Sequence, residues 1–220
     1  MLGVTVSATC LRNVLRLHGL PPAPRRQVLA WSEFLRAQAQ SILATAFFHV
    51  DSVTGQRYYA LFAIEIERRV AHLLGVTTNP NGAWVSQMPR NLVLDLQEAR
   101  HTMRFLIRDR DTKFAAALDS VLRSEGIETV HTPVRAPRAN ASAGRWVETV
   151  RAEQLVHLLI FSHCQLEQVL STYVNHYNAA RPHRGIGLET PRPTVPGDPL
   201  DNLERYDVLG GLIHEYRHAG

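Results

Sequence analysis

The side chains best suited to chemistry lie in a short charged turn that follows an apolar segment. The segment Phe105-Leu-Ile leads into Arg108, and Asp109 and Asp111 follow directly. Carboxylate oxygens are the hard ligands that Mg²⁺ takes in proteins. Two such ions, about 4 Å apart, stabilise the attacking and leaving oxygens when a phosphodiester is displaced in line. Three acids from separate elements can surround the two ions, and an acid directly after a strand is a candidate for such a role. Asp111 either adds to weak binding of a single metal ion or is a solvated residue of the turn.

Arginine carries nearly all of the positive charge of the chain. There are 23 arginines and a single lysine, Lys113, against 20 acidic residues, which gives a formal net charge of +4. Residues 198–220 sum to −3, so the chain before them sums to +7. Guanidinium groups bind phosphate oxygens well, and a basic body is therefore compatible with a nucleic-acid partner. The charge alone does not choose this partner, because many other proteins share it.

Composition and spacing exclude several other classes of protein. With 45 % hydrophobic and 20 % charged residues, the chain can bury a core and is not expected to be disordered. Its longest apolar stretches are far shorter than the roughly 20 residues of a membrane span, and no signal peptide opens it. Cys10 and Cys164 lie far apart, and neither they nor the 11 histidines show the spacing of a zinc site. We therefore expect a reduced, cytoplasmic protein that does not enter a membrane.

The two ends of the chain differ from its middle. Residues 1–41 predict a helical arm, with a helix over 7–18, a proline-rich linker over 20–26 and a second helix over 27–41. The pattern is typical of the end of a helix-turn-helix DNA-binding region, and a solvated helical arm gives the same pattern. Residues 196–220 form an acidic tail in which no motif indicates a role.

Residues 42–195 predict an α/β core. Three antiparallel strands are expected between residues 42 and 77, followed by two further strands at 104–108 and 127–132. Helices are expected between the later strands, and two long helices at 142–160 and 164–179 follow a basic loop. This order predicts a mixed sheet with helices on its faces.

Three strings in this core resemble the integrase core of insertion-sequence transposases. They are Phe105-Leu-Ile-Arg-Asp109-Arg-Asp-Thr-Lys-Phe114, Arg135-Ala-Pro-Arg-Ala-Asn140-Ala and, the most specific, His176-Tyr-Asn-Ala-Ala-Arg-Pro-His-Arg184. The resemblance covers about residues 40–195. It implies a ribonuclease-H-like fold, a role in DNA transposition or integration, and double-stranded DNA at the element ends as partner. It also implies Mg²⁺ or Mn²⁺ as cofactor and leaves self-association into a homo-oligomer open.

The same resemblance implies a DDE-type triad of carboxylates, of which this chain keeps one. The position just after the fourth strand matches Asp109. The position on the first strand holds Ala46, and the position near the start of the helix after the basic loop holds Gly144. Neither residue can coordinate a metal through its side chain. We therefore expect a degenerate site in which Asp109 is at most the one metal ligand.

Two nearby acids are candidates to replace the missing ones. Asp51 lies five positions after Ala46, and an odd offset on a strand faces the other side of the sheet. Glu148 is better placed, because it lies four residues after Gly144 and residues i and i+4 share a helix face. Where Glu148 is not a ligand, its charge repels phosphate.

Contacts with the DNA backbone are predicted for basic residues spread over the core. Such contacts supply affinity without sequence choice. The predicted residues are Lys113, Arg135, Arg138, Arg145, Arg151, Arg181 and Arg184. The side chains of the string that begins at His176 are expected to fix the last helix against the core rather than to act in catalysis.

Three functions remain open from the sequence. The first is an integrase-core protein that binds DNA but cannot catalyse strand transfer. The second is an active metal-dependent polynucleotidyl transferase or nuclease that uses Asp109 with Glu148. The third is a non-functional remnant of an insertion sequence that still folds.

Overall fold

The chain divides into two units, residues 1–36 and residues 37–220. The computed structural model describes residue 17 and residues 31–98, 101–111, 116–132, 140–193 and 203–218. Helix α2 (Trp31–Ala37) belongs almost entirely to the first unit, and within it the rings of Trp31 and Phe34 pack 5.7 Å apart. It falls within the helix expected over 27–41. Apart from Leu17, the helix expected over 7–18 and the linker over 20–26 lie outside the described residues.

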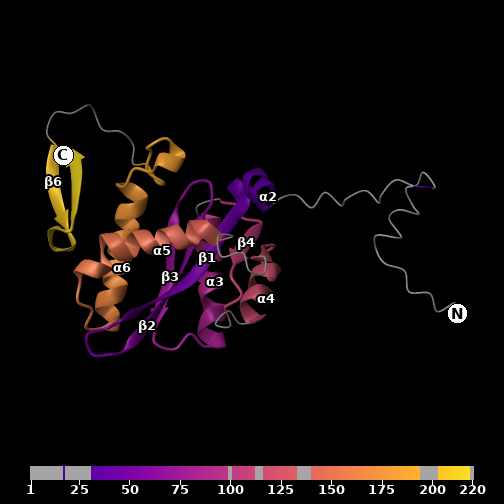
Figure 1. The fold of residues 1–220 in the computed structure, drawn as a ribbon, viewed down its shortest axis with the longest axis horizontal. Helices are drawn as coiled ribbons and strands as arrows, with labels where there is room; N and C mark the ends of the chain where they lie inside the picture. Colours follow the sequence, from indigo (N-terminus) through magenta and orange to yellow (C-terminus); the bar gives the residue numbers. More distant parts are fainter. Residues whose placement is uncertain are drawn as a thin grey trace. The chain divides into compact units, whose positions relative to one another are not determined.

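The second unit is built on a five-stranded mixed sheet (Figure 1). A single 3-10 turn, η1 (Ala39–Ser41), leads into it. Its first three strands form the expected antiparallel meander, and the last two run parallel to the first of them. The strands are β1 (Ile42–Asp51), β2 (Arg57–Glu65), β3 (Ala71–Thr77), β4 (Phe105–Arg108) and β5 (Glu128–His131). They lie in the order β3-β2-β1-β4-β5. This order and these directions are those of the ribonuclease-H-like fold, as predicted.

Helices cover both faces of the sheet, so the sheet lies between two apolar cores. Residues of β1 alternate between them: Leu43 packs with residues of α3 (Gly82–Glu98) and α4 (Ala116–Ser124), whereas Ala44 and Phe48 pack with residues of α5 (Ala141–Glu153) and α6 (His163–Ala179). Figure 1 shows α5 running across the strands.

The core under α5 is aromatic. Trp146 is 2 % exposed and stacks on Phe62 of β2 with ring centroids 4.2 Å apart. Phe48, Tyr173 and Tyr177 meet the same indole edge-on. Offset and edge-on pairs of this kind add to the stabilisation that burial alone supplies. The indole therefore fixes the position of α5 over β1 and β2.

Helix α5 is shorter than the sequence predicts. The helix expected over 142–160 ends at Glu153, and after Gln154 a short 3-10 turn, η3 (Leu155–His157), leads into extended chain. The cause is tertiary: Ile160 is buried in the core, and its carbonyl accepts a hydrogen bond of 2.8 Å from the amide of Val53. A continuous helix would carry Ile160 away from that position. The prediction of one long helix here was wrong.

The acidic segment at the end of the chain folds into a hairpin. Strands β6 (Leu203–Val208) and β7 (Ile213–His218) pair antiparallel across the 3-10 turn η5 (Leu209–Gly211). Gly210 and Gly211 have φ of 69° and 88°, the left-handed region that favours glycine. Ile213 is buried in the core that contains α6. None of the helices in the described ranges is long and apolar enough to cross a membrane.

Candidate functional site

The structure places the first two carboxylate positions on neighbouring strands. In the parallel ladder of β1 and β4, Ile42 lies opposite Phe105 and Ala44 lies opposite Ile107. Continued by two residues, this register sets Ala46 opposite Asp109, which follows β4 directly. Adjacent strands lie about 4.8 Å apart. Ala46 is half-buried and faces the core beneath α5.

The third position lies on the helix that is tied to the same part of β1. The side-chain amide of Asn140, just before α5, donates a hydrogen bond of 2.9 Å to the carbonyl of Thr45. Gly144 follows one turn later and is exposed. A Cβ at Gly144 would meet nothing within 4 Å. The fold therefore leaves room for a longer side chain there, and the sequence does not supply one.

Asp109 is half-buried and its carboxylate is engaged by its own turn. Its Oδ1 accepts a hydrogen bond of 3.1 Å from the amide of Asp111. The preceding Arg108 is buried and forms a bidentate ion pair with Asp119 of α4, at 2.8 and 3.1 Å. Burial acts to raise the pKa of Asp119, but the hydrogen bonds and charge of Arg108 outweigh it and the net shift is downward. This buried pair anchors the turn that carries Asp109.

The residues present do not fit a pair of metal ions. Ala46 and Gly144 have no donor atom in their side chains, which leaves Asp109 as the single acid among the three positions. Among the described residues, no group of three or more His, Cys, Asp or Glu side chains could hold a metal ion. A Mg²⁺ pair needs several hard oxygen ligands to balance its charge. No step of a reaction is therefore assigned to a metal here.

The two candidate replacements lie near the carboxyl end of β1, Asp51 as its last residue and Glu148 on α5. Asp51 forms a bidentate ion pair with Arg57 across the hairpin, at 2.7 and 2.9 Å. Glu148 is exposed and lines a cavity of about 540 Å³ with His49 and Asp51. A strand rises about 3.3 Å per residue, so this end of β1 lies more than 10 Å from Ala46. Glu148 thus shares a cavity with Asp51 rather than with Asp109.

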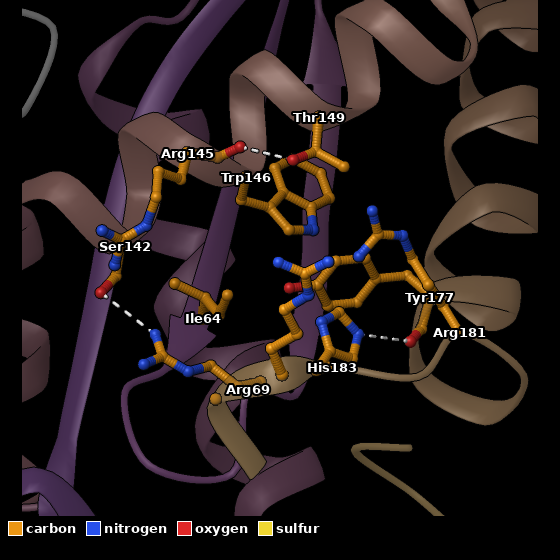
Figure 2. A pocket seen from close by; sticks show the side chains of 11 residues that line it. Ile64, Arg69, Ser142, Arg145, Trp146, Thr149, Tyr177, Arg181 and His183 are labelled. Carbon is orange, nitrogen blue, oxygen red and sulfur yellow. Dashed lines mark hydrogen bonds between the residues drawn. The ribbon is translucent and has the colours of Figure 1, made fainter. Parts of the chain in front are cut away.

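The described part of the predicted DNA-contacting set falls into two places. Arg151 donates a hydrogen bond of 2.9 Å to the carbonyl of His49, which fixes α5 to β1. Arg145, Arg181 and Arg184 line a single pocket (Figure 2). The other three predicted residues, Lys113, Arg135 and Arg138, lie outside the described residues.

One functional candidate in this pocket was not predicted from the sequence. Arg69 lies between β2 and β3, half-buried, and its guanidinium donates a hydrogen bond of 3.4 Å to the hydroxyl of Ser142 on α5. Its backbone φ of 63° is uncommon for a residue with a side chain. The pair Arg68-Arg69 in a turn was a weak signal, because turn arginines are ordinarily solvated. Only the fold brings Arg69 against α5.

The string from His176 to Arg184 holds the end of α6 in place, as expected. The buried side chain of Asn178 accepts a hydrogen bond of 2.9 Å from the amide of Ala71 and donates one of 2.8 Å to its carbonyl. Arg181 forms an ion pair with Glu153 at the end of α5. His176 contacts Glu215 of the hairpin at 3.0 Å. These contacts join α6 to β3, to α5 and to the hairpin.

Comparisons with known proteins point to one family. A family model described as the integrase core domain matches residues 125–191, which include Gly144 and the string from His176. The chain is also similar to a solved structure, the catalytic core domain of BIV integrase, with 17% sequence identity and a TM-score of 0.49 over 69% of this chain and 91% of that one. No curated protein matches the chain. Residues 125–191 thus match the integrase core domain, in a chain whose strand order is that of the ribonuclease-H-like fold.

Proposed function

We propose that the chain binds double-stranded DNA and does not catalyse strand transfer. One observation supports the proposal: of the three carboxylate positions that the family resemblance gives, only Asp109 holds an acid. The parallel register of β1 and β4 and the hydrogen bond from Asn140 to Thr45 favour a common location for the three positions.

The loss of two ligands removes the main source of catalysis in such a core. Metal ions held by carboxylates stabilise the charge that develops on the attacking and leaving oxygens, and this electrostatic stabilisation is usually the largest contribution to the rate. A lone carboxylate at Asp109 cannot hold two ions in place. We therefore expect the rate of phosphodiester cleavage to fall by several orders of magnitude relative to a complete triad.

Binding to DNA does not depend on the missing acids. Arg145 and Arg184 are exposed on adjoining elements, α5 and the short turn η4 (Arg184–Ile186). Contacts between such groups and backbone phosphates release counterions and give affinity for any sequence. The expected binding is therefore sequence-tolerant and falls steeply as the salt concentration rises.

The catalytic part is tested with the purified full chain and plasmid DNA in Mg²⁺ and, separately, in Mn²⁺. We expect neither nicking nor joining above background, and no difference between the wild-type chain and Asp109→Asn. Turnover that disappears in Asp109→Asn would overturn the proposal, because it would show that a working metal site includes this residue.

Glu148→Gln separates the proposal from an enzyme that uses Asp109 with Glu148. In that enzyme the substitution abolishes cleavage. In a DNA-binding protein without catalysis it leaves cleavage at background and strengthens binding to duplex DNA, because it removes a negative charge from α5. The two functions therefore predict different results for one substitution.

The binding part is tested by fluorescence anisotropy with a labelled duplex at several salt concentrations. We expect the logarithm of the association constant to fall linearly with the logarithm of the salt concentration, with a slope of about −0.9 for each phosphate contacted. A folded chain that fails to bind duplex DNA at low salt would contradict the proposal and favour a remnant without function.

A further inference from the structure

A pocket of about 290 Å³ opens where α5, the end of α6 and the turn η4 meet the segment between β2 and β3. Four arginines line it: Arg69, Arg145, Arg181 and Arg184. Figure 2 shows Arg69, Arg145 and Arg181 entering it from three different elements around the indole of Trp146. We refer to it as the four-arginine pocket. Its volume is at the low end of the range for small-molecule sites, about 300–1,000 Å³, so it suits a small group rather than a large cofactor.

The charges in this pocket are poorly balanced. No acidic side chain is among its lining residues, and Glu153, which pairs with Arg181 from just outside, neutralises one of the four arginines. Burial and then the charge of Arg145 lower the pKa of Arg69. Like charges held together in a partly buried site raise the energy of the empty pocket. An anion entering it would lower that energy.

The wall of the pocket also offers a neutral donor. The indole N–H of Trp146 is buried and has no hydrogen-bond partner within the described part of the chain. Figure 2 shows the indole nitrogen on the side of the ring that faces Arg181 and Tyr177. Buried N–H groups are nearly always hydrogen-bonded in native proteins, and one without a partner calls for an explanation. A bound acceptor would supply the partner.

The segment around Arg69 is held in the shape that the pocket needs. Arg69 has a positive φ, and two residues further on the side chain of Asn178 is hydrogen-bonded to both the amide and the carbonyl of Ala71. A Cβ at Gly185 would lie 3.5 Å from Nε of Arg69, so the turn η4 approaches the guanidinium closely. Left-handed backbone at a residue with a side chain is energetically unfavourable and persists where the surrounding structure imposes it. Here it directs Arg69 towards α5.

We propose that the four-arginine pocket binds a single phosphate group. Guanidinium forks match the planar pairs of oxygens on phosphate and hold them by two parallel hydrogen bonds. Several arginines from different elements, together with the Trp146 N–H, can surround one tetrahedral anion on more than one side. That the phosphate belongs to a DNA strand rests on the function proposed above, whereas the anion site itself does not. Within DNA, the group is either a 5′-terminal phosphate or a phosphate of the backbone.

The anion site is tested with inorganic phosphate and the full chain by NMR. Addition of phosphate should shift the indole N–H resonance of Trp146, which Trp146→Phe assigns by removing it. Arg145→Gln and Arg184→Gln replace exposed residues, so the chain should still fold, and each should weaken phosphate binding about tenfold, since a charge-assisted hydrogen bond contributes about 1.5 kcal/mol. Arg90→Gln removes the same charge from the exposed surface of α3 and should change nothing.

Glu153→Gln should change the affinity for phosphate in the opposite direction. It removes the acid that pairs with Arg181 and should tighten phosphate binding. An unshifted indole resonance in the wild-type chain, or a shift of equal affinity in the pocket variants and in Arg90→Gln, would overturn the proposal. If an acidic peptide displaces phosphate at a concentration equal to that of phosphate itself, the pocket does not prefer phosphate to carboxylate, and the proposed specificity is wrong.

Two duplexes that differ only in a 5′-phosphate or a 5′-hydroxyl identify the source of the group. A shift of the Trp146 resonance with the phosphorylated duplex alone assigns a terminal phosphate, and a shift with both assigns a backbone phosphate. Duplex binding by anisotropy without any shift would overturn the assignment to DNA while the proposed function stands. Failure of all duplex binding, with the phosphate shift retained, would overturn the proposed function and leave the anion site.

Discussion

Helix α5 borders two regions that differ in charge: one lacks the carboxylates expected there, and the other concentrates arginines. Gly144 and Glu148 share one face of this helix, and Gly144 occupies one of the three carboxylate positions, of which only Asp109 holds an acid. Arg145 and Thr149 lie one residue further on and line the four-arginine pocket, where four cations face one nearby acid. A complete carboxylate triad repels itself unless metal ions are bound, so its loss relieves repulsion in the metal-free chain. The arginine cluster has no such relief. Of these two regions, the one whose charge is unbalanced is the four-arginine pocket, and its positive charge favours the binding of an anion.

Removal of the residue between the two regions should have the largest effect. Trp146→Ala deletes a fully buried indole that packs on Phe62 and Tyr173 and that also forms the wall of the pocket. We expect a loss of about 3–5 kcal/mol in the free energy of unfolding, measured by urea titration. Val156→Ala, at a residue 73 % exposed, is the control and should change stability by less than about 0.5 kcal/mol. A Trp146→Ala chain of near-native stability would show that α5 is not fixed by its aromatic core.

Asn178→Ala should damage the pocket and spare the carboxylate region. The substitution leaves the amide and the carbonyl of Ala71 without their partner, at a cost of about 2–4 kcal/mol for two buried backbone groups. Because Ala71 follows closely on Arg69, we also expect weaker phosphate binding and faster hydrogen exchange at the Ala71 amide. The register of β1 with β4 should stay protected from exchange. Equal loss of protection in β4 would mean that the two regions are not separable.

Restoring the two missing acids should make the region around Asp109 strongly negative. Ala46→Asp with Gly144→Glu places three carboxylates together, and their repulsion should lower the free energy of unfolding by about 1–2 kcal/mol in chelator. Mg²⁺ should return that stability. The neutral pair Ala46→Asn with Gly144→Gln is the matched control for side-chain size and helix propensity. A melting temperature that is the same with chelator and with Mg²⁺ would show that these positions do not converge.

Most of the fold could be predicted because its signals are local. The apolar stretches that form β1 and β2, and the turn residues at 52–57 and 79–82 that separate the strands, are visible in side-chain type and spacing. The end of α5 could not be predicted in this way, because the apolar residues after Glu153 continue a helical pattern. Only the hydrogen bond between Ile160 and Val53, which are far apart in sequence, ends the helix there.

The candidate site, too, has parts that local sequence predicts and parts that depend on contacts between residues far apart in sequence. Positions 46, 109 and 144 came from sequence strings; the parallel register sets 46 and 109 on neighbouring strands, and Asn140 ties the helix of position 144 to Thr45. Arg69 could not be found, since nothing local distinguishes it from the exposed arginine beside it. Its place in the pocket depends on a contact with Ser142, 73 residues away, and the hairpin at the end of the chain likewise depends on distant contacts of Ile213 and Glu215.

The smallest expected effect concerns His183, which lines the four-arginine pocket and whose ring lies tilted against that of Tyr177, with centroids 4.4 Å apart. Burial comes first among the causes that lower its pKa, and the charges of Arg181 and Arg69 act in the same direction, while the carbonyl of Tyr177 and the charge of Glu153 oppose them. In the unfolded chain the histidine titrates near 6.5. Below that pH the unfolded state binds the proton more readily than the folded state, so this residue makes stability fall as the pH falls through 6.5. His183→Gln should therefore flatten the decline in the free energy of unfolding between pH 7.5 and 5.5 relative to the wild-type chain, as measured by urea titration. Saturating phosphate should flatten the wild-type decline as well, because an anion beside His183 favours its protonated form. A decline that phosphate leaves unchanged would place the bound anion away from this histidine.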